Sequence, residues 1–407
     1  MVTSVRNTLR PVYLVDGVRT PIGKFAGGLS TVRTDDLAAH VVRALVERQP
    51  AAAERVDQVV FGSTNQAGED NRNVARMALL LAGLSFDVPG VTVNRLCGSG
   101  LEAIGSAARM IAMGEVDVAI AGGVESMSRA PYVMAKMDKP FARKAPEMYD
   151  SSLGWRFPNP KMKERFPLIS MGETAENVAK KHGISREDQD AFALESHRRA
   201  QAATEAGRFA DEIVPVTVPQ RKGDPVVVTT DESIRPETSL DKLAKLRPVF
   251  REGGSVTAGN SSPINDGSAA VMLVAGSVME ELGLTPMGRI VANATVGVDP
   301  SYMGEGPIGA VRKLLKRCEL RMPNVDMVEL NEAFAAQALA CMRTLELDPE
   351  KVNVNGGALA IGHPIGCSGA RIMVTLAHAM KARDASLGVA SLCIGVGQGI
   401  ATLLERA

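Results

Sequence analysis

Short β-branched segments alternate with longer helical patterns in the first and last parts of this 407-residue chain. Val91–Val93 and Val352–Val354 are examples, and each precedes a helical pattern rich in Ala, Met and Arg. Strands that alternate with helices form parallel sheets covered by helices, and reactive residues then gather at the carboxyl ends of the strands. The pattern therefore predicts an α/β fold.

The two ends of the chain also repeat short motifs in the same order. The three matched pairs are Val56–Val60 with Val325–Glu329, Gly98–Gly100 with Cys367–Gly369, and Val118–Gly123 with Ala390–Gly395. The first two pairs are both 269 residues apart. Shared order and near-constant spacing favour an internal duplication over chance. We expect an N-terminal half over 1–125, which returns at 255–281, and a C-terminal half over 282–407.

Residues 126–254 differ in their sequence pattern from the two halves, and we expect an inserted loop domain there. Ser185 as a helix N-cap, with Glu187 and Asp188 in the first turn, predicts one helix. Methionines are spread through the stretch, and we expect them to line an adaptable apolar channel or to fill the core of the insert. They are Met127, Met134, Met137, Met148 and Met162.

Composition excludes several classes of partner. The chain has 46 Lys and Arg against 46 Asp and Glu, so no overall field recruits nucleic acid or an anionic membrane. No apolar run approaches the roughly 20 residues that span a bilayer. The five cysteines are scattered and the start of the chain lacks a secretory signal, which favours a reduced, cytoplasmic protein.

Two cysteines and one histidine lie in glycine-rich surroundings. Cys97 lies within Asn94–Gly100, His363 follows Gly362, and Cys393 begins Cys393–Gly399, thirty residues after His363. Glycine lets backbone N–H groups approach a substrate oxygen closely. A nucleophile, a base and a second acid/base suit a carbon–carbon bond reaction on a thioester. Because Cys97 opens a helix, we expect the helix start to lower its pKa.

Five motifs in this order resemble the thiolase family, and the resemblance runs almost from end to end. They are Asn94–Gly100, Gly122–Ser128, Asn331–Phe334, Asn355–Gly369 and Cys393–Gly399. The resemblance implies two similar α/β halves stacked in α-β-α-β-α layers, with a loop domain inserted. It also implies coenzyme A as co-substrate, no permanently bound cofactor or metal, and a homodimer or homotetramer.

The resemblance implies a role for each matching residue. Cys97 takes the acyl group, His363 activates it and helps bind the thioester oxygen, and Asn331 holds a water in the same oxyanion hole. Cys393 exchanges a proton at the acyl α-carbon, and the N–H groups of Cys97 and Gly395 form the second oxyanion hole. The residues matched to coenzyme A contacts are Arg235, Ser262 and Met171.

Substrate choice is indicated by other residues. Gln66–Asn73, Gly154–Phe157 and Val396 resemble the 3-oxoadipyl-CoA branch, which releases succinyl-CoA and acetyl-CoA. Candidate partners for the terminal carboxylate are Arg72, Arg129, Lys136 and Arg156. The alternatives are a biosynthetic acetoacetyl-CoA thiolase, a ketosynthase, which the second cysteine disfavours, and a Cys-His-Asn hydrolase.

Overall fold

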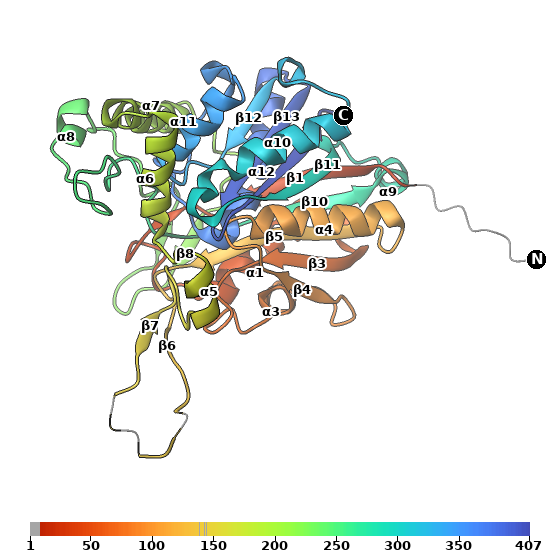
Figure 1. Ribbon diagram of the computed structural model, residues 1–407. Coiled ribbons are helices and arrows are strands. Elements are labelled where there is room, and N and C mark those ends of the chain that lie inside the picture. Colours follow the sequence, from red (N-terminus) through yellow and green to blue (C-terminus); the bar gives the residue numbers. More distant parts are fainter. Residues whose placement is uncertain (1–8, 138, 142, 144) are drawn as a thin grey trace, which may run out of the picture.

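The computed structural model describes residues 9–137, 139–141, 143 and 145–407. Over these residues ten strands pair in one sheet, in the order β12-β13-β14-β11-β1-β10-β5-β3-β4, with the short β2 (Gly23–Lys24) beside β10. β1 and β11 join its two parts through only Tyr13–Arg289 and Leu14–Gly288. The sheet is therefore two half-sheets that meet at a narrow seam (Figure 1).

Each half-sheet has the same strand order. The strands of the N-terminal half are β4 (Gly90–Val93), β3 (Val56–Gly62), β5 (Val118–Ser126), β10 (Asn265–Ala275) and β1 (Val12–Arg19). Those of the C-terminal half are β12 (Met327–Leu330), β13 (Leu387–Ile394), β14 (Gln398–Glu405) and β11 (Gly288–Gly297). The counterpart of β4 is a single parallel bridge from Val352 to Val328 rather than a strand. The order confirms that the fold consists of two similar halves.

Helices cover both faces of each half-sheet. The helices α4 (Ser99–Met113) and α12 (Ile365–Arg383) pack on each other in the middle, with α4 on β3 and β5 and α12 on strands of both halves. The outer helices of the N-terminal half are α1 (Thr34–Arg48), α2 (Pro50–Ala53), α3 (Val74–Leu81) and α9 (Gly276–Leu282). Those of the C-terminal half are α10 (Gly306–Arg317) and α11 (Ala335–Thr344), with 3-10 turns at Pro300–Glu305, Met322–Asn324 and Pro349–Lys351. The layers are α-β-α-β-α, as predicted (Figure 1).

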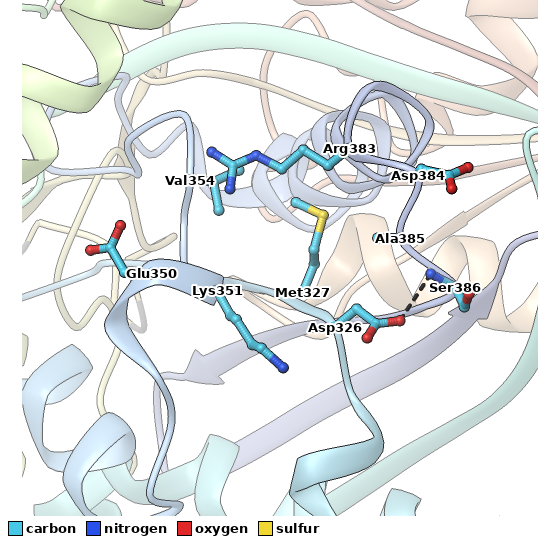
Figure 2. Close-up of a pocket in the computed structure, with 9 residues that line it drawn as sticks. All are labelled: Asp326, Met327, Glu350, Lys351, Val354, Arg383, Asp384, Ala385 and Ser386. Carbon is cyan, nitrogen blue, oxygen red and sulfur yellow. Dashed lines mark hydrogen bonds between the residues drawn. The ribbon is translucent and has the colours of Figure 1, made fainter.

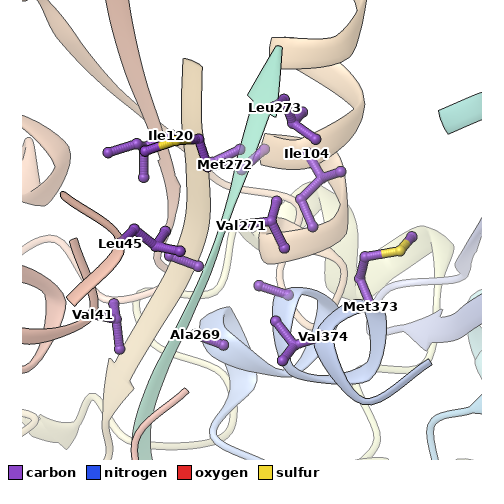
Figure 3. Close-up of a cluster of buried hydrophobic side chains, with 14 of the residues drawn as sticks. Val41, Leu45, Ile104, Ile120, Ala269, Val271, Met272, Leu273, Met373 and Val374 are labelled. Atoms are coloured by element: carbon purple, nitrogen blue, oxygen red, sulfur yellow. The ribbon is translucent and has the colours of Figure 1, made fainter. Parts of the chain in front are cut away.

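Both faces of β10 are buried, which explains its continuous apolar sequence. Figure 3 shows Val271 and Leu273 on the side of α4 and α12, where Ile104 and Val374 lie. Met272 points to the opposite side, toward α1. Side chains alternate across a strand, so a strand between two helical layers needs apolar residues at every position.

The inserted segment carries the remaining elements. They are β6 (Tyr132–Met134), β7 (Met148–Asp150), α5 (Pro160–Arg165), α6 (Met171–His182), α7 (Arg186–Glu205), β8 (Val216–Val218), β9 (Val226–Val228) and α8 (Leu240–Ala244). Ser185 caps α7 with a capping box, which confirms the predicted helix start. The domain boundaries proposed from the sequence remain predictions.

The expectation for the methionines is wrong for most of them. Met134, Met137 and Met148 are 57%, 48% and 63% exposed, on or beside the β6–β7 hairpin that projects from the body in Figure 1. They neither line a channel nor fill a core, and only Met127 is buried. No helix in the described part of the chain is long and apolar enough to cross a membrane.

Candidate active site

Cys97 lies in a tight loop between β4 and α4. The hydroxyl of Ser99, the first residue of α4, donates to the carbonyl of Leu96 at 2.6 Å and accepts the N–H of Arg95 at 2.9 Å. Leu96 adopts a left-handed φ of 45°, which is uncommon outside glycine. The Arg95 side chain bonds Gln398 of the other half at 3.0 Å. The loop is therefore fixed at both ends and presents Cys97 at the start of the central helix.

The predicted lowering of the Cys97 pKa is wrong in direction. Burial raises the pKa of the thiol, and the hydrogen-bonding N–H groups of Gly395 and of Cys97 itself only partly oppose this. The nearby charge of Glu125 raises it further. The residue keeps some exposed surface, but the sulfur is shielded enough for burial to dominate. The resting group is a neutral thiol that needs a base.

Cys393 and Gly395 lie where β13 turns into β14. Cys393 is buried, and burial together with Cys97 and Cys341 raises its thiol pKa well above the ordinary value. Gly395 faces the loop of Cys97, since a side chain there would lie 3.5 Å from Leu96 and 3.4 Å from the Met171 sulfur. The N–H of Gly395 hydrogen-bonds the Cys97 sulfur. Both cysteines and this N–H group therefore meet in one place.

The turn that follows Gly395 is strained. Val396 adopts a φ of 64°, in the left-handed region that suits glycine and not a β-branched residue. Strain of this kind, of order 1–3 kcal/mol per residue, persists where surrounding contacts determine the backbone. Here it lies one residue from the N–H group that bonds Cys97.

His363 is held from three sides. Its backbone N–H donates to Asn265 at 2.9 Å, and its Nδ1 lies 2.6 Å from the Ser368 hydroxyl. That hydroxyl donates to the carbonyl of Pro364 at 2.9 Å, so it accepts the Nδ1–H of the imidazole. This fixes the tautomer in which Nε2 carries the lone pair. Nε2 lies 3.4 Å from the Asn331 amide nitrogen.

Burial lowers the pKa of His363 to about 4, with a smaller contribution from the charge of Arg371. The imidazole is therefore neutral at pH 7 and able to accept a proton. Asn331 follows β12 and donates its backbone N–H to Ser391 of β13 at 2.9 Å. Its side-chain oxygen is buried and has no protein partner among the described residues. The pair of side chains suits a polar substrate atom.

Two buried glutamates, which the sequence reasoning did not single out, tie the loops of the site together. Glu125 is the last residue but one of β5 and accepts hydrogen bonds from the Thr64 hydroxyl at 2.6 Å and the Gly366 N–H at 2.9 Å. Glu332 accepts from Ser196 and Asn353, each at 2.7 Å. Burial raises the pKa of both carboxyls. An acidic residue that directly follows a buried strand run was the signal available in the sequence.

The three residues that resemble coenzyme A contacts in other thiolases do not all lie in one place. Met171, the first residue of α6, packs in the apolar cluster that contains Cys393. Ser262 donates its backbone N–H to Ala333 at 3.0 Å, two residues from Asn331. Arg235 is exposed beside α7, where its backbone N–H donates to His197 at 3.2 Å. Arg235 therefore reaches only a ligand that extends over the surface.

A separate pocket of about 310 Å³ lies away from these residues. It is formed at the start of β12 and at the end of α12, by residues that include Asp326, Lys351 and Arg383 (Figure 2). The 19 residues of α12 place it roughly 27 Å from the helix start near His363. None of the predicted site residues lines this pocket.

The remaining cysteines do not join the site chemistry. Cys341 and Cys367 are buried, and burial raises the pKa of each thiol to about 12. Cys318 caps the end of α10. No group of three or more His, Cys, Asp or Glu side chains in the described ranges is arranged to hold a metal ion.

Family models match almost the whole chain. The model described as "Thiolase, N-terminal domain" matches residues 12–277, and "Thiolase, C-terminal domain" matches residues 284–406. These matches and the layered fold define the class of protein, an acyltransferase that acts on thioesters. The chain belongs to the thiolase family, whose members use coenzyme A as a substrate and cleave 3-oxoacyl-CoA by thiolysis.

Individual relatives are similar over their full lengths. A beta-ketoadipyl-CoA thiolase of Pseudomonas aeruginosa is 56% identical over 400 residues, covering 98% of this chain and 99% of its own. The crystal structure of the Bacillus anthracis acetyl-CoA acetyltransferase has a TM-score of 0.93 and 43% identity, covering 98% of this chain and 100% of that chain. Human mitochondrial 3-ketoacyl-CoA thiolase in complex with CoA has a TM-score of 0.91 and 39% identity, covering 98% and 99%.

Proposed function

We propose that this thiolase cleaves 3-oxoadipyl-CoA with coenzyme A to give succinyl-CoA and acetyl-CoA, through an acyl group on Cys97. The observation that carries the chemistry is the meeting of Cys97, Cys393 and the N–H of Gly395. The substrate is supported by beta-ketoadipyl-CoA thiolases at 53% and 56% identity, against 48% and 43% for two acetyl-CoA acetyltransferases.

Each proton transfer in the proposed reaction has a donor and an acceptor. His363 takes the proton of Cys97 on Nε2, and the thiolate adds to the 3-oxo carbon. The bond from that carbon to the α-carbon then breaks, and its electron pair takes the Cys393 proton to release acetyl-CoA. Coenzyme A attacks the acyl group on Cys97 and returns a proton to Cys393, while His363 reprotonates Cys97. Donors at Gly395 and Asn331 stabilise the oxygen charges that develop.

Cys393→Ala tests the division between the two cysteines. The variant should still acquire an acetyl group on Cys97 from acetyl-CoA, yet lose thiolysis and condensation by roughly 10²–10⁴-fold. Intact-protein and peptide mass spectrometry would locate the acetyl group. Near-wild-type thiolysis by this variant, or an acetyl group on Cys318 or Cys341, would contradict the assignment.

Arg156 is the best placed of the four candidate carboxylate partners. Arg129 is already engaged by Glu69 at 2.5 and 2.6 Å, and Arg72 and Lys136 are exposed. Arg156 is half-buried and uses one nitrogen, Nη1, on the Ser151 carbonyl at 2.8 Å. We propose that its other N–H groups bind the terminal carboxylate of the substrate.

The neighbours of Arg156 connect it to the catalytic residues. Trp155 donates from its indole N–H to the Ile169 carbonyl at 3.3 Å, two residues before Met171. Met171 lies against Gly395 and packs with Cys393. The segment that carries Arg156 is therefore attached to the segment that borders the acyl group.

Two substrates of equal chain length test this choice. We expect kcat/KM for 3-oxoadipyl-CoA to exceed that for 3-oxohexanoyl-CoA by about 10²-fold, because a charge-assisted Arg–carboxylate contact is lost with the neutral chain. Arg156→Gln should remove most of this preference, whereas Arg129→Gln, the matched control, should change both substrates alike. Equal turnover of the two substrates by the wild type would favour a broad or acetoacetyl-CoA thiolase.

The quaternary state belongs to the same proposal, as a homodimer or homotetramer. β4 is an edge strand of the sheet, and Val91 on it is 41% exposed. Leu81 and Phe86, just before β4 in the chain, are 46% and 77% exposed. An uncovered apolar strand edge favours pairing with a second copy. Light scattering should give two or four times 43.0 kDa, and a monomer at micromolar concentration would contradict this.

We also propose a cytoplasmic location and no permanently bound cofactor. The five cysteines are all free, which suits a reducing compartment. Cell fractionation would test the location, and mass spectrometry of the native purified protein would reveal any resident cofactor.

A further inference from the structure

The motif Gly122–Ser128 supplies no reacting group to the proposed reaction, yet it places a carboxylate in the interior of the protein. This carboxylate belongs to Glu125, which is 3% exposed. Its Oε2 accepts the N–H and the hydroxyl of Thr64 at 3.0 and 2.6 Å and the N–H of Gly366 at 2.9 Å. Its Oε1 accepts the N–H of Asn65 at 3.1 Å. A single buried side chain therefore joins the loop after β3 to the start of α12.

The bond to Gly366 holds the helix start that orients His363. Gly366 is the second residue of α12, and the N–H groups of a first helical turn have no partner within the helix. Glu125 provides that partner, and a side chain added at Gly366 would lie only 2.8 Å from Glu125 Oε2. Ser368, in the same turn, lies 2.6 Å from Nδ1 of His363. Glu125 therefore fixes the turn of helix on which the orientation of His363 depends.

A second path of hydrogen bonds leads from Glu125 to the loop of Cys97. Thr64, which donates to Glu125 twice, accepts at its own carbonyl the side-chain N–H of Asn94 at 3.1 Å. The side-chain oxygen of Asn94 in turn accepts the N–H of Leu96 at 2.9 Å. Leu96 directly precedes Cys97 in the chain. The position of the nucleophile loop is therefore tied to the same carboxylate.

A third path leads to Arg156, the proposed partner of the substrate carboxylate. Asn65 donates its backbone N–H to Glu125 and its side-chain N–H to the Ser151 hydroxyl at 2.9 Å. The Ser151 hydroxyl donates to the Pro131 carbonyl at 2.6 Å, and the Ser151 carbonyl accepts Nη1 of Arg156 at 2.8 Å. Asn65 and Ser151 are both buried, so water cannot readily replace these bonds.

We propose that Glu125 is a positioning residue shared by the chemistry and by the choice of substrate. It holds the helix start that orients His363 and, by way of Ser151, the segment that carries Arg156. One side chain then sets the spacing between the reacting end of the acyl chain and the group that binds its far end. Such spacing affects rate strongly, because small misplacements of a bound chain are costly. The inference rests on the proposed role of Arg156.

Glu125→Gln separates the paths, because the two side chains have the same shape. Three donors meet at Oε2 and one at Oε1. The amide oxygen should therefore take the place of Oε2 and leave the NH2 group against the N–H of Asn65. The path to Arg156 is then broken, while the bonds to Thr64 and Gly366 remain. Glu125→Ala breaks all of these bonds.

The ratio of kcat/KM for 3-oxoadipyl-CoA to that for 3-oxohexanoyl-CoA measures the path to Arg156. We expect this ratio to fall from about 10² in the wild type to below about 10 in Glu125→Gln, because the arginine is no longer held where the carboxylate arrives. Glu125→Ala should in addition lower kcat on both substrates by roughly 10²-fold, since His363 and Cys97 are then misplaced as well.

Two further variants distinguish positioning from a general loss of stability. Ser151→Ala removes the acceptor of the Asn65 side chain and should lower the ratio as much as Glu125→Gln does. Combining the two substitutions should lower it no further, because both break one path. Glu332→Gln, the matched control, alters another buried glutamate whose donors belong to other segments. It should change kcat/KM for both substrates alike and leave the ratio unchanged.

Hydrogen exchange tests the same path without a substrate. Peptides over residues 63–67 and 150–157 contain Asn65 and Ser151. In Glu125→Gln both peptides should exchange roughly 5–10-fold faster than in the wild type, because the hydrogen bonds that protect them are lost. In Glu332→Gln they should exchange as in the wild type. Mass spectrometry of the native, full-length variants measures this.

The outcomes separate the inference from the proposed substrate. A wild-type ratio of about 10² that persists in Glu125→Gln would overturn the inference, and so would additive losses from Glu125→Gln and Ser151→Ala. Equal turnover of both substrates by the wild type would instead contradict the proposed substrate. Exchange at 150–157 then decides whether Glu125 positions this segment: faster exchange in Glu125→Gln supports the inference, and unchanged exchange overturns it. If Glu125→Ala does not fold, Glu125→Gln and Ser151→Ala suffice for this test.

Discussion

The two halves of the protein start their central helices with matching serines that hold different atoms. Ser99 and Ser368 are related by the 269-residue repeat and lie in the first turns of α4 and α12. Ser99 bonds only the backbone of its loop, at Arg95 and Leu96. Ser368 bonds the backbone at Pro364 and also the imidazole of His363. The equivalent serines of the two halves therefore hold different groups, a backbone loop in one half and a side chain in the other.

The difference shows how a duplicated fold can supply two chemical roles. In the first loop, the serine shapes the backbone and leaves the Cys97 sulfur to the N–H of Gly395 from the other half. In the second loop, the serine fixes the tautomer of His363. The Cys97 loop of the first half is therefore completed by a donor of the second half, which places the candidate active site at their junction.

The pKa values of Cys97 and His363, in the two loops, are also shifted in opposite directions, and together these shifts determine which groups are protonated at neutral pH. Burial raises the pKa of the Cys97 thiol and lowers that of His363 to about 4. At neutral pH the Cys97 thiol therefore keeps its proton and the His363 imidazole is neutral. Transfer to the imidazole becomes favourable only when a substrate and its oxyanion donors stabilise the product of the attack.

The largest expected effect separates the cysteines of the two loops. Cys97→Ala should lower thiolysis by at least about 10⁴-fold, because no other group can carry the acyl intermediate. Cys367→Ala, in the second loop, should change it less than about 3-fold, since burial keeps that thiol protonated with a pKa of about 12. Assay of acetyl-CoA released from acetoacetyl-CoA measures both. Comparable losses of thiolysis in the two variants would contradict the different roles assigned to Cys97 and Cys367.

The close approach of the two central helices should be nearly as sensitive. A side chain added at Gly369 would lie 2.3 Å from the Leu101 nitrogen, and one at Gly100 would lie 2.6 Å from that of Ala370. Backbone atoms cannot yield at these distances, so we expect Gly369→Ala to lower the free energy of unfolding by roughly 3–5 kcal/mol, at the upper end for point substitutions.

A glycine of an outer helix provides the control for this substitution. At Gly309 in α10 an added side chain would meet the flexible Val296 side chain at 3.2 Å. Gly309→Ala should therefore lie within about 1 kcal/mol of the wild type, since alanine also favours the helix. Denaturant unfolding compares the variants, and an unaffected Gly369→Ala would show that the helices can separate without loss.

The sequence was sufficient for the parts that local pattern or duplication determines. The repeat at Gly98–Gly100 and Cys367–Gly369 predicted two equivalent halves because both helices need small residues where they cross. The strand–helix alternation predicted the layers. The capping residues of α7 were predicted because a helix N-cap depends only on neighbours along the chain.

Features that depend on contacts between distant segments were missed. The Cys97 pKa was predicted from its helix start alone, but burial by the other half outweighs that local effect. The methionines of the β6–β7 hairpin look like core residues in sequence and are exposed because the hairpin projects from the body. That Arg371 is buried without a hydrogen-bond acceptor among the described residues can be recognised only once β12 and α12 are placed beside each other.

The raised thiol pKa predicts how alkylation of Cys97 depends on pH. Below its pKa the thiolate fraction grows about tenfold per pH unit, so labelling by iodoacetamide should increase roughly 100-fold from pH 7 to pH 9. A thiolate formed at neutral pH would instead give a nearly flat profile. Cys97 keeps some exposed surface and should still react before Cys341, Cys367 and Cys393, which are buried. Peptide mass spectrometry after timed labelling, with protection by substrate, measures this.

The smallest expected effect is the one that tests the serine comparison directly. Ser368→Ala removes the acceptor of the His363 Nδ1–H and should lower kcat by roughly 10–100-fold, the usual effect of losing a partner that orients a functional imidazole. KM should change little, since Ser368 is buried and only orients the imidazole.

Ser99→Ala, the matched substitution in the other half, removes two backbone contacts of the Cys97 loop. It should act mainly on the free energy of unfolding, by about 1–2 kcal/mol, and leave kcat within a few-fold of the wild type. Steady-state kinetics and denaturant unfolding of the two variants give both quantities. If Ser99→Ala lowers kcat as much as Ser368→Ala at equal stability, the two serines perform the same task and the halves have not diverged in this respect.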